Sequence, residues 1–171
     1  MHLNSFFQAY NFPVVFTRAA NVYGPGQQLY RIIPRTILYA RLGKKLPLHG
    51  GGKSERSFIH INDVADATYR VAINGQAGNT YHLSATNTIS IRNLVIKICE
   101  DLKVNFSDLV DESEDRLGKD QSYMLNSNKI RKQLGWVDTI GLDQGIQSTI
   151  EWVDSNLETL KNLPFKYIHK S

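Results

Sequence analysis

Polar side chains gather around one loop near the start of the chain. A β-branched apolar run at residues 14–17 leads into the loop Asn21-Val22-Tyr23-Gly24-Pro25-Gly26, which glycine and proline interrupt. A strand that ends in such a loop is where an open α/β sheet places its ligand groups, at the carboxyl ends of the strands. The Asn21 amide can hydrogen-bond ligand oxygens there, or it can bond its own backbone as turn asparagines do. The pattern predicts a ligand-binding loop.

The composition limits which other kinds of chemistry the chain can carry. Of its 171 residues, 42% are hydrophobic and 21% are charged, which is ordinary for a globular protein with one sizeable core. The 20 basic and 16 acidic residues give a net charge of +4, and no block of five like charges occurs. That pattern argues against a nucleic-acid-binding arm. It suits a protein that binds an anionic small molecule, although many proteins without such a ligand share it.

The cysteine and histidine content gives no sign of disulfide or metal chemistry. The single cysteine, Cys99, lies in an apolar helical stretch, so we interpret it as a buried, unreactive thiol. The histidines show no metal-ligand spacing, no metal site is expected, and we interpret His60 as structural. The chain has no apolar run of 18 residues and no signal-peptide pattern, so the sequence predicts a cytoplasmic protein without a membrane segment.

The spacing of the apolar residues predicts alternating helices and strands around the loop. Helices are predicted over residues 2–10, 32–42, 91–102 and 141–160, with one from a cap at Asn62 or Asp63 to residue 73 and one from a cap at Ser127 to about residue 134. Strands are predicted over residues 13–17, 45–48, 56–61, 80–83 and 123–125, and residues 105–120 as a loop with a short strand. The other expected caps are Ser90 at an N-terminus and Gly43 and Gly135 at C-termini.

Five segments resemble, in order and approximate spacing, motifs of the extended short-chain dehydrogenase/reductase family, the NAD-dependent epimerases and dehydratases. They are Arg18 to Pro25 (R-x-x-N-x-Y-G-P), His49 to Ala65 (G-x-G-x-x-x-R-D/S-F-I-H-V-x-D-V-A), Asn79 to Leu83 (Y-N-I/L-G), Asp115 to Asp120 (D-R-P-G-H-D) and Lys129 to Trp136 (K-I-x-x-x-L-G-W). The resemblance covers almost the whole chain. It implies an α/β fold made of the C-terminal part of a Rossmann-type domain and a small mixed α/β substrate-binding domain.

The resemblance also implies domain boundaries and a branch of the family. Residues 1–28 match the last part of the Rossmann domain and residues 29–171 mostly the substrate-binding domain, with residues 56–84 partly returning to the Rossmann sheet. The segment Tyr30 to Pro34 resembles E-K-L-I-P of the dTDP-glucose 4,6-dehydratases. These lyases oxidise C4 of the sugar, remove water across C5 and C6, and reduce C6. UDP-sugar 4-epimerases and decarboxylases share most of the other motifs and stay open as alternatives.

The family motifs assign binding roles to individual residues. The resemblance implies substrate contacts from Asn21, Arg31, Pro47, His49, Arg56 and Arg116, and contacts to NAD from Tyr23, Gly24 and Pro25. Arg56 and Arg116 are the candidates for the diphosphate, because guanidinium groups form bidentate, charge-assisted bonds with phosphate oxygens. Pro47 and His49 match positions that line the nucleobase. Arg31 is expected either to reach a phosphate or sugar hydroxyl or to be an ordinary exposed arginine.

Two motifs that the family's chemistry requires do not occur in this sequence. The chain has neither the G-x-x-G-x-x-G turn that holds the NAD pyrophosphate nor the Y-x-x-x-K pair that supplies the catalytic base. We therefore expect no catalytic residue here, an inactive isolated chain, and NAD held mainly by an N-terminal half, with a homodimer for the full-length enzyme. The alternative class is a non-catalytic module that binds a nucleotide sugar or dimerises.

Overall fold

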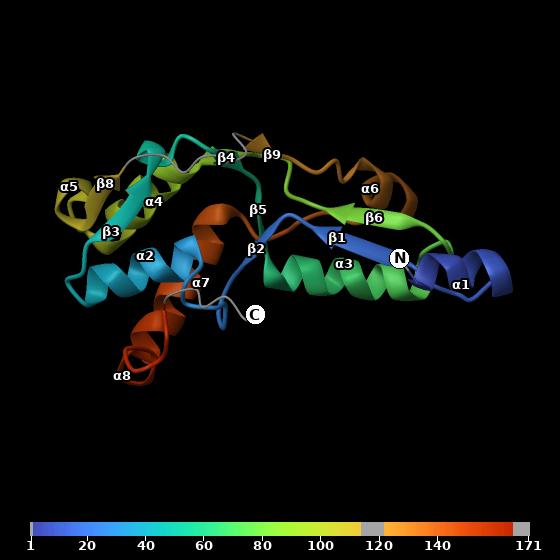
Figure 1. Ribbon diagram of the computed structural model, residues 1–171, viewed down its shortest axis with the longest axis horizontal. Coiled ribbons are helices and arrows are strands. Elements are labelled where there is room, and N and C mark those ends of the chain that lie inside the picture. The colour runs from blue at the N-terminus through green and yellow to red at the C-terminus, as the bar shows by residue number, and fades with distance from the viewer. Residues whose placement is uncertain (1, 114–121, 166–171) are drawn as a thin grey trace. The chain divides into compact units, whose positions relative to one another are not determined.

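The computed structural model describes residues 2–113 and 122–165, which form a mixed α/β structure (Figure 1). Its helices are α1 (His2–Tyr10), α2 (Ile32–Arg41), α3 (Ile61–Asn74), α4 (Ile91–Leu102), α5 (Phe106–Leu109), α6 (Asn128–Leu134), α7 (Leu142–Ser155), α8 (Leu157–Leu160) and the 3₁₀ turn η1 (Gly50–Gly52). Its strands are β1 (Phe16–Ala19), β2 (Asn21–Tyr23), β3 (Leu46–His49), β4 (Glu55–Arg56), β5 (Phe58–His60), β6 (Thr80–Leu83), β7 (Ile89–Ser90), β8 (Val110–Ser113) and β9 (Ser122–Tyr123). The expected α/β class is confirmed.

The chain folds into two compact units, each built from three stretches of sequence. Unit 1 comprises the residues up to Val22, Ser57–Thr88 and Tyr123–Gly141. Among the described residues, unit 2 comprises Tyr23–Arg56, residues 89–113 with Ser122, and residues 142–165. Within the part of the chain that the structure describes, every helix is too short or too polar to span a lipid bilayer.

Unit 1 is a parallel strand pair covered by two helices. Strands β1 and β6 pair in parallel, with Phe16 opposite Thr80 and Ala19 opposite Leu83. Helix α3 packs along both strands and α6 packs against β6 (Figure 1). The core contains the buried side chains Ile59, Ala67, Val71, Tyr81, Leu83, Ile130 and Trp136. Because β1 and β6 run in the same direction, their carboxyl ends, where the chain turns toward Asn21 and Ser84, lie at one edge.

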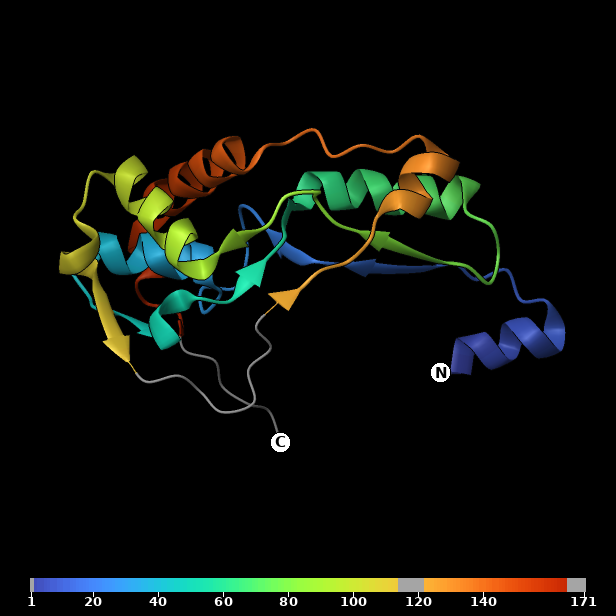
Figure 2. The same ribbon diagram turned by 90° about the horizontal axis from the view of Figure 1, so that it is seen from above.

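Unit 2 is built on helices α2, α4 and α7. Helix α2 packs against both α4 and α7 (Figure 2), and strand β3 pairs in parallel with β8. Strand β4 pairs with β7 in the antiparallel direction, with Arg56 opposite Ile89. One core cluster contains Tyr39, Leu46, Leu48, Val95, Cys99, Leu109 and Val110. The predicted burial of Cys99 is confirmed, since its side chain is 2% exposed.

Most of the predicted elements form, but several of their ends differ. The predictions for residues 2–10, 80–83 and 91–102 are confirmed, and Ser90 caps α4 by accepting a hydrogen bond from the Asn93 N–H at 3.1 Å. The strand predicted over 13–17 begins later, at Phe16. The strand predicted over 56–61 is two strands, because Ser57 separates β4 from β5. The expected loop over 105–120 contains the short helix α5 before β8, and residues 114–121 lie outside the described residues.

Two of the expected helix ends were wrong. The cap of α3 is His60, whose Nδ1 accepts the Asn62 N–H at 3.3 Å, and neither Asn62 nor Asp63 serves as the cap. The helix predicted over 141–160 is divided into α7 and α8 at Asn156. The first helix ends there because Asn156 has a non-helical backbone, with φ −117° and ψ 10°, and its N–H is shared between the Trp152 and Val153 carbonyls.

Candidate ligand-binding site

The loop that follows β1 is held at its first residue by two hydrogen bonds to one carbonyl. The Asn21 backbone N–H donates to the Ser57 carbonyl at 3.2 Å, and the Asn21 side-chain Nδ2 donates to the same oxygen at 3.0 Å. The side-chain amide of Asn21 therefore has a structural role at this edge of unit 1. Its Oδ1 is an acceptor in addition to that bond.

The next part of the loop, which opens unit 2, is fixed by burial. The Tyr23 side chain is 2% exposed, and its hydroxyl lies 3.5 Å from the Leu142 carbonyl at the start of α7. Gly24 is buried at a φ of 142°, a backbone conformation that residues with a Cβ rarely adopt. Pro25 is exposed. The Tyr23 phenol is thus directed into the protein, and the exposed part of this segment begins at Pro25 and continues to Gly26.

Arg31 lies at the solvent-exposed start of α2. It is the N-cap residue of that helix, and its guanidinium lies 5.4 Å from the centre of the Tyr30 ring. A cation over an aromatic face is attracted by the ring quadrupole, so Tyr30 holds the guanidinium near the helix start. Both a ligand contact and an ordinary exposed arginine are compatible with this position.

Pro47 and His49 share one face of strand β3. The strand alternates, with Leu46 and Leu48 buried in the core of unit 2 and Pro47 and His49 half-buried. Residues two apart on a strand point to the same side. The two residues expected to line the nucleobase therefore lie next to each other on the face opposite the core.

Of the two arginines expected to bind the diphosphate, the structure describes one. Arg56 is half-buried on β4, and its Nη1 donates to the Glu55 carbonyl at 2.7 Å. Arg116 lies outside the described residues. Among the described site residues, Asn21 belongs to unit 1 and all the others belong to unit 2.

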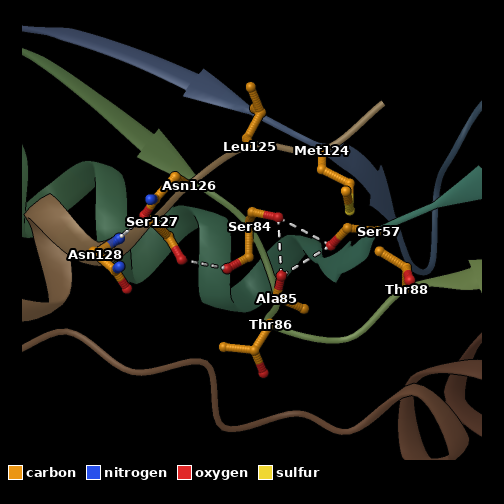
Figure 3. Close-up of a pocket in the computed structure, with 10 residues that line it drawn as sticks. All are labelled: Ser57, Ser84, Ala85, Thr86, Thr88, Met124, Leu125, Asn126, Ser127 and Asn128. Carbon is orange, nitrogen blue, oxygen red and sulfur yellow. Dashed lines mark hydrogen bonds between the residues drawn. The ribbon is translucent and has the colours of Figure 1, made fainter. Parts of the chain in front are cut away.

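Unit 1 also contains a cavity of about 190 Å³ beyond the carboxyl end of β6 (Figure 3). Its lining is neutral and rich in hydroxyl and amide groups: Ser57, Ser84, Ala85, Thr86, Thr88, Met124, Leu125, Asn126, Ser127 and Asn128. The Ser84 hydroxyl lies 2.9 Å from the Ser57 Oγ, which donates to the Ala85 carbonyl at 3.1 Å. The Ser127 hydroxyl donates to the Ser84 carbonyl at 2.9 Å. These serines join two of the three stretches of unit 1, a role that their separation in sequence did not reveal.

Burial and ion pairing shift a few ionisable groups. Burial lowers the pKa of His60, against a smaller opposing effect of the Asp63 charge. Burial raises the pKa of the Cys99 thiol. A hydrogen-bonded carboxylate raises the pKa of Arg41, which pairs with Asp154. Among residues 2–113 and 122–165, no cluster of three or more His, Cys, Asp or Glu side chains could hold a metal ion.

A match to a known protein family shows which family this chain belongs to. Residues 1–149 match the GDP-mannose 4,6 dehydratase family. The chain belongs to that family. The expected membership of the NAD-dependent epimerases and dehydratases is confirmed at this level.

The curated relatives of this dehydratase-family chain are named for two different sugar nucleotides, dTDP-glucose and UDP-glucose. The mouse dTDP-D-glucose 4,6-dehydratase is 33% identical over 165 residues, which cover 94% of this chain and 46% of the mouse protein. An Arabidopsis thaliana trifunctional protein that includes a UDP-glucose 4,6-dehydratase is 34% identical over 151 residues, which cover 88% of this chain and 23% of that protein. The chain spans about half the length, or less, of the curated relatives it matches.

Solved structures match the fold of most of this chain. The dTDP-glucose 4,6-dehydratase from Bacillus anthracis, solved in complex with NAD, has a TM-score of 0.88 and 31% identity, covering 94% of this chain and 51% of that one. The Bordetella bronchiseptica enzyme WbmF, solved with NAD⁺ and UDP, has a TM-score of 0.80 and 29% identity, with 94% and 51% covered. The match corresponds to the C-terminal portion of these Rossmann-type structures, as the sequence motifs predicted.

The residues of this chain fit one part of an NAD site. The turn at Gly24 follows β2, and its positive φ lets backbone approach a ligand closely without a side chain in the way. The geometry of the turn is compatible with a bound NAD. The pyrophosphate cradle of this family is a separate element, and its glycine motif does not occur in the sequence.

Proposed function

We propose that this chain is the nucleotide-sugar-binding half of an NAD-dependent sugar-nucleotide dehydratase that acts on dTDP-glucose. The reaction oxidises C4 of the sugar, removes water across C5 and C6, and reduces C6. NAD would be held in part by Tyr23, Gly24 and Pro25, and it would supply the hydride acceptor for C4 and the hydride donor for C6. The proposal includes a cytoplasmic homodimer for the full-length enzyme. It is supported by the family match and by relatives named as dTDP-glucose 4,6-dehydratases.

One observation carries the proposal. The loop with the family's N-x-Y-G-P motif has a defined backbone, since Asn21 is bonded twice to Ser57, Tyr23 is buried, and Gly24 has a φ of 142°. A loop held at each of these residues is organised before any ligand arrives. Preorganised groups bind a ligand without the entropic cost of ordering the loop.

The proposed contacts divide the substrate by chemistry. Arg56 and Arg116 bind the diphosphate, since guanidinium groups keep their charge and offer paired N–H donors. Pro47 and His49, which share one face of β3, contact the nucleobase, with the imidazole stacked on the ring. Asn21 and Arg31 bind oxygens of the sugar or of the phosphates. Tyr23, Gly24 and Pro25 contact the nicotinamide end of NAD.

Binding at the nucleotide has a catalytic purpose in this scheme. The diphosphate and base lie away from the carbons that react, so their binding energy is available to hold the sugar in one orientation. The proton transfers at the sugar are assigned to groups outside this chain, because the Y-x-x-x-K pair does not occur in its sequence. A UDP-sugar is the second candidate substrate, since the Arabidopsis relative is named for UDP-glucose.

A chimera tests the proposed reaction. The chain would be fused after the N-terminal half of the Escherichia coli dTDP-glucose 4,6-dehydratase, a relative that is 32% identical over 162 residues. We expect the chimera to bind NAD and to remove one water from dTDP-glucose, detected by mass spectrometry, and to act more slowly on UDP-glucose. The Arg56→Ala chimera should lose most of this activity. A chimera that binds NAD and dTDP-glucose yet forms no dehydrated product would contradict the proposal.

A further inference from the structure

Helix α7 contains a glycine against which the Tyr23 ring lies. A Cβ on Gly145 would overlap the Tyr23 hydroxyl oxygen and would lie 2.6 Å from Cζ and 2.7 Å from Cε2. Cβ atoms in proteins essentially never approach another heavy atom closer than 3.0 Å. The Tyr23 ring therefore occupies the space that any side chain at residue 145 would need.

The conformation of α7 gives no separate reason for a glycine at this position. Gly145 lies inside a regular helix, where glycine is less favourable than alanine because it loses more backbone freedom on folding. Its neighbours Ile146, Thr149, Ile150 and Val153 are buried, so the helix is well packed on this side. The Gly145 carbonyl also accepts the hydroxyls of Ser148 and Thr149, at 2.9 Å and 2.7 Å. The contact with Tyr23 is the feature that requires the missing side chain.

The contact between Tyr23 and Gly145 bears directly on the ligand-binding loop, because Tyr23 belongs to that loop. Tyr23 is followed directly by the buried Gly24 and the exposed Pro25. A tyrosine side chain has only two rotatable angles between its backbone and its ring, so a ring that is 2% exposed also fixes its own Cα. The path of the chain at Gly24 thus depends on where the ring lies against α7.

We propose that Gly145 is a positioning residue for the loop from Asn21 to Pro25. By lacking a Cβ it lets the hydroxyl end of the Tyr23 ring lie against α7, and the ring then holds the backbone of Gly24 and Pro25 in the geometry that meets the ligand. The effect on ligand affinity rests on the proposed function. The effect on the loop itself does not.

A matched pair of alanine variants tests the proposal in the full chain. Gly145→Ala introduces a methyl group under the Tyr23 ring, whereas Gly141→Ala, four residues earlier, introduces one where no atom lies within 4 Å. The loop is followed by amide hydrogen exchange at Val22, Tyr23 and Gly24, stability by the thermal midpoint, and ligand binding by calorimetry with dTDP.

The two variants should differ in every measurement. Gly145→Ala should lower the thermal midpoint, speed exchange at the loop amides by at least about tenfold and weaken dTDP binding by at least about tenfold. Gly141→Ala should match wild type in exchange at the loop amides and in dTDP binding. If Gly145→Ala raises the midpoint, as helix propensity alone predicts, and leaves the loop amides unchanged, the proposal is wrong.

A second substitution covers the case in which Gly145→Ala does not fold. Tyr23→Leu removes the ring while Gly145 keeps its space, so the loop amides should again exchange faster although no clash is introduced. Unchanged exchange at Gly24 in Tyr23→Leu would also overturn the proposal. Absence of dTDP binding to wild type would contradict the proposed function alone, because the exchange measurements need no ligand.

Discussion

The buried carboxylate of Asp63 accepts two hydrogen bonds from Thr139, a residue 76 positions later in the chain. The Thr139 N–H and hydroxyl donate to Oδ1 at 3.0 Å and 2.9 Å, and the Ile140 N–H donates to Oδ2 at 3.1 Å. The Trp136 indole N–H donates to the Asp63 backbone carbonyl at 3.3 Å. Asp63 thereby holds the segment that follows α6 against the first turn of α3.

Replacing Asp63 by asparagine should destabilise unit 1. The asparagine amide keeps one acceptor oxygen but presents an N–H₂ group to a backbone donor, so at least one buried N–H loses its partner. We expect the free energy of unfolding to fall by about 2–3 kcal/mol, the usual cost of losing a hydrogen bond to a buried charged group. Urea titration followed by circular dichroism measures this loss.

The same helix offers the control for that substitution. Asp66 is exposed and pairs with Arg70 one turn later, at 2.8 Å. Exposed pairs at this spacing contribute little, so Asp66→Asn should change the free energy of unfolding by less than about 0.5 kcal/mol. Equal losses in the two variants would show that the Asp63 contacts do not stabilise the fold.

The family motif around Asp63 could be found in the sequence, but its physical role could not. The sequence placed Asp63 at the start of a helix, where a negative charge is favourable beside the helix dipole. Its partners Thr139 and Ile140 lie far along the chain, and no local pattern connects them. The cap was misassigned for a related reason: His60 is uncommon as a cap, and only the geometry brings its Nδ1 to the Asn62 N–H.

The free energy of unfolding should decrease as pH falls through the range in which His60 takes up a proton in the unfolded chain. Burial lowers the pKa of His60 in the folded chain below its ordinary value of 6.5, whereas the unfolded chain keeps that value. Below about pH 6.5 the unfolded state therefore binds more protons, and the free energy of unfolding decreases as pH falls. Urea midpoints measured between pH 8 and pH 5 give this slope.

A substitution at the cap isolates the histidine contribution to that slope. In His60→Asn the asparagine Oδ1 can still accept the Asn62 N–H, but the residue no longer titrates. Subtracting the pH profile of the His60→Asn variant from that of wild type removes the contribution of the other titratable groups. If the difference in the free energy of unfolding between wild type and His60→Asn stays constant from pH 8 to pH 5, protonation of His60 is not coupled to folding.

Arg131 joins α6 to the carboxyl end of β6, and we expect its replacement by lysine to lower the stability of the fold. Its Nη2 donates to the Ser84 carbonyl at 3.0 Å and to Asp138, and its Nε donates to the Ser127 hydroxyl at 3.0 Å. A lysine ammonium cannot reproduce this planar set of donors. Arg131→Lys should lower the free energy of unfolding by about 1–3 kcal/mol, as measured by urea titration.

The next residue gives a matched comparison for Arg131. Lys132 is exposed on the same helix, so Lys132→Arg exchanges the same two residue types where no such network exists. Its free energy of unfolding should stay within about 0.5 kcal/mol of wild type. If Arg131→Lys were as mild as Lys132→Arg, the bonds to Ser84 and Ser127 would not contribute to stability.

Part of the candidate site could be predicted from the sequence, because local sequence patterns indicate it, as they indicate the helices and strands. The N-x-Y-G-P loop is a local pattern, so the sequence indicated it. The shared face of Pro47 and His49 was not predicted, because the expected strand ended at residue 48 whereas β3 includes His49. The contact between Tyr23 and Gly145 joins residues 122 positions apart. In the sequence, Gly145 is only a glycine within an amphipathic helix. Burial of the Tyr23 ring was likewise hidden, because a tyrosine in a polar loop gives no sign of which way it points.

The most direct test of the nucleotide-sugar-binding role is calorimetric titration of the chain with dTDP, comparing wild type, Arg56→Ala and Arg70→Ala. We expect wild type to bind dTDP, and Arg56→Ala to bind about 10 to 100 times more weakly, the loss of one charge-assisted contact to phosphate. Arg70→Ala, which removes an exposed arginine of α3, should bind like wild type. If the folded wild-type chain takes up no dTDP, or if Arg56→Ala and Arg70→Ala bind it equally well, the account of this site is contradicted.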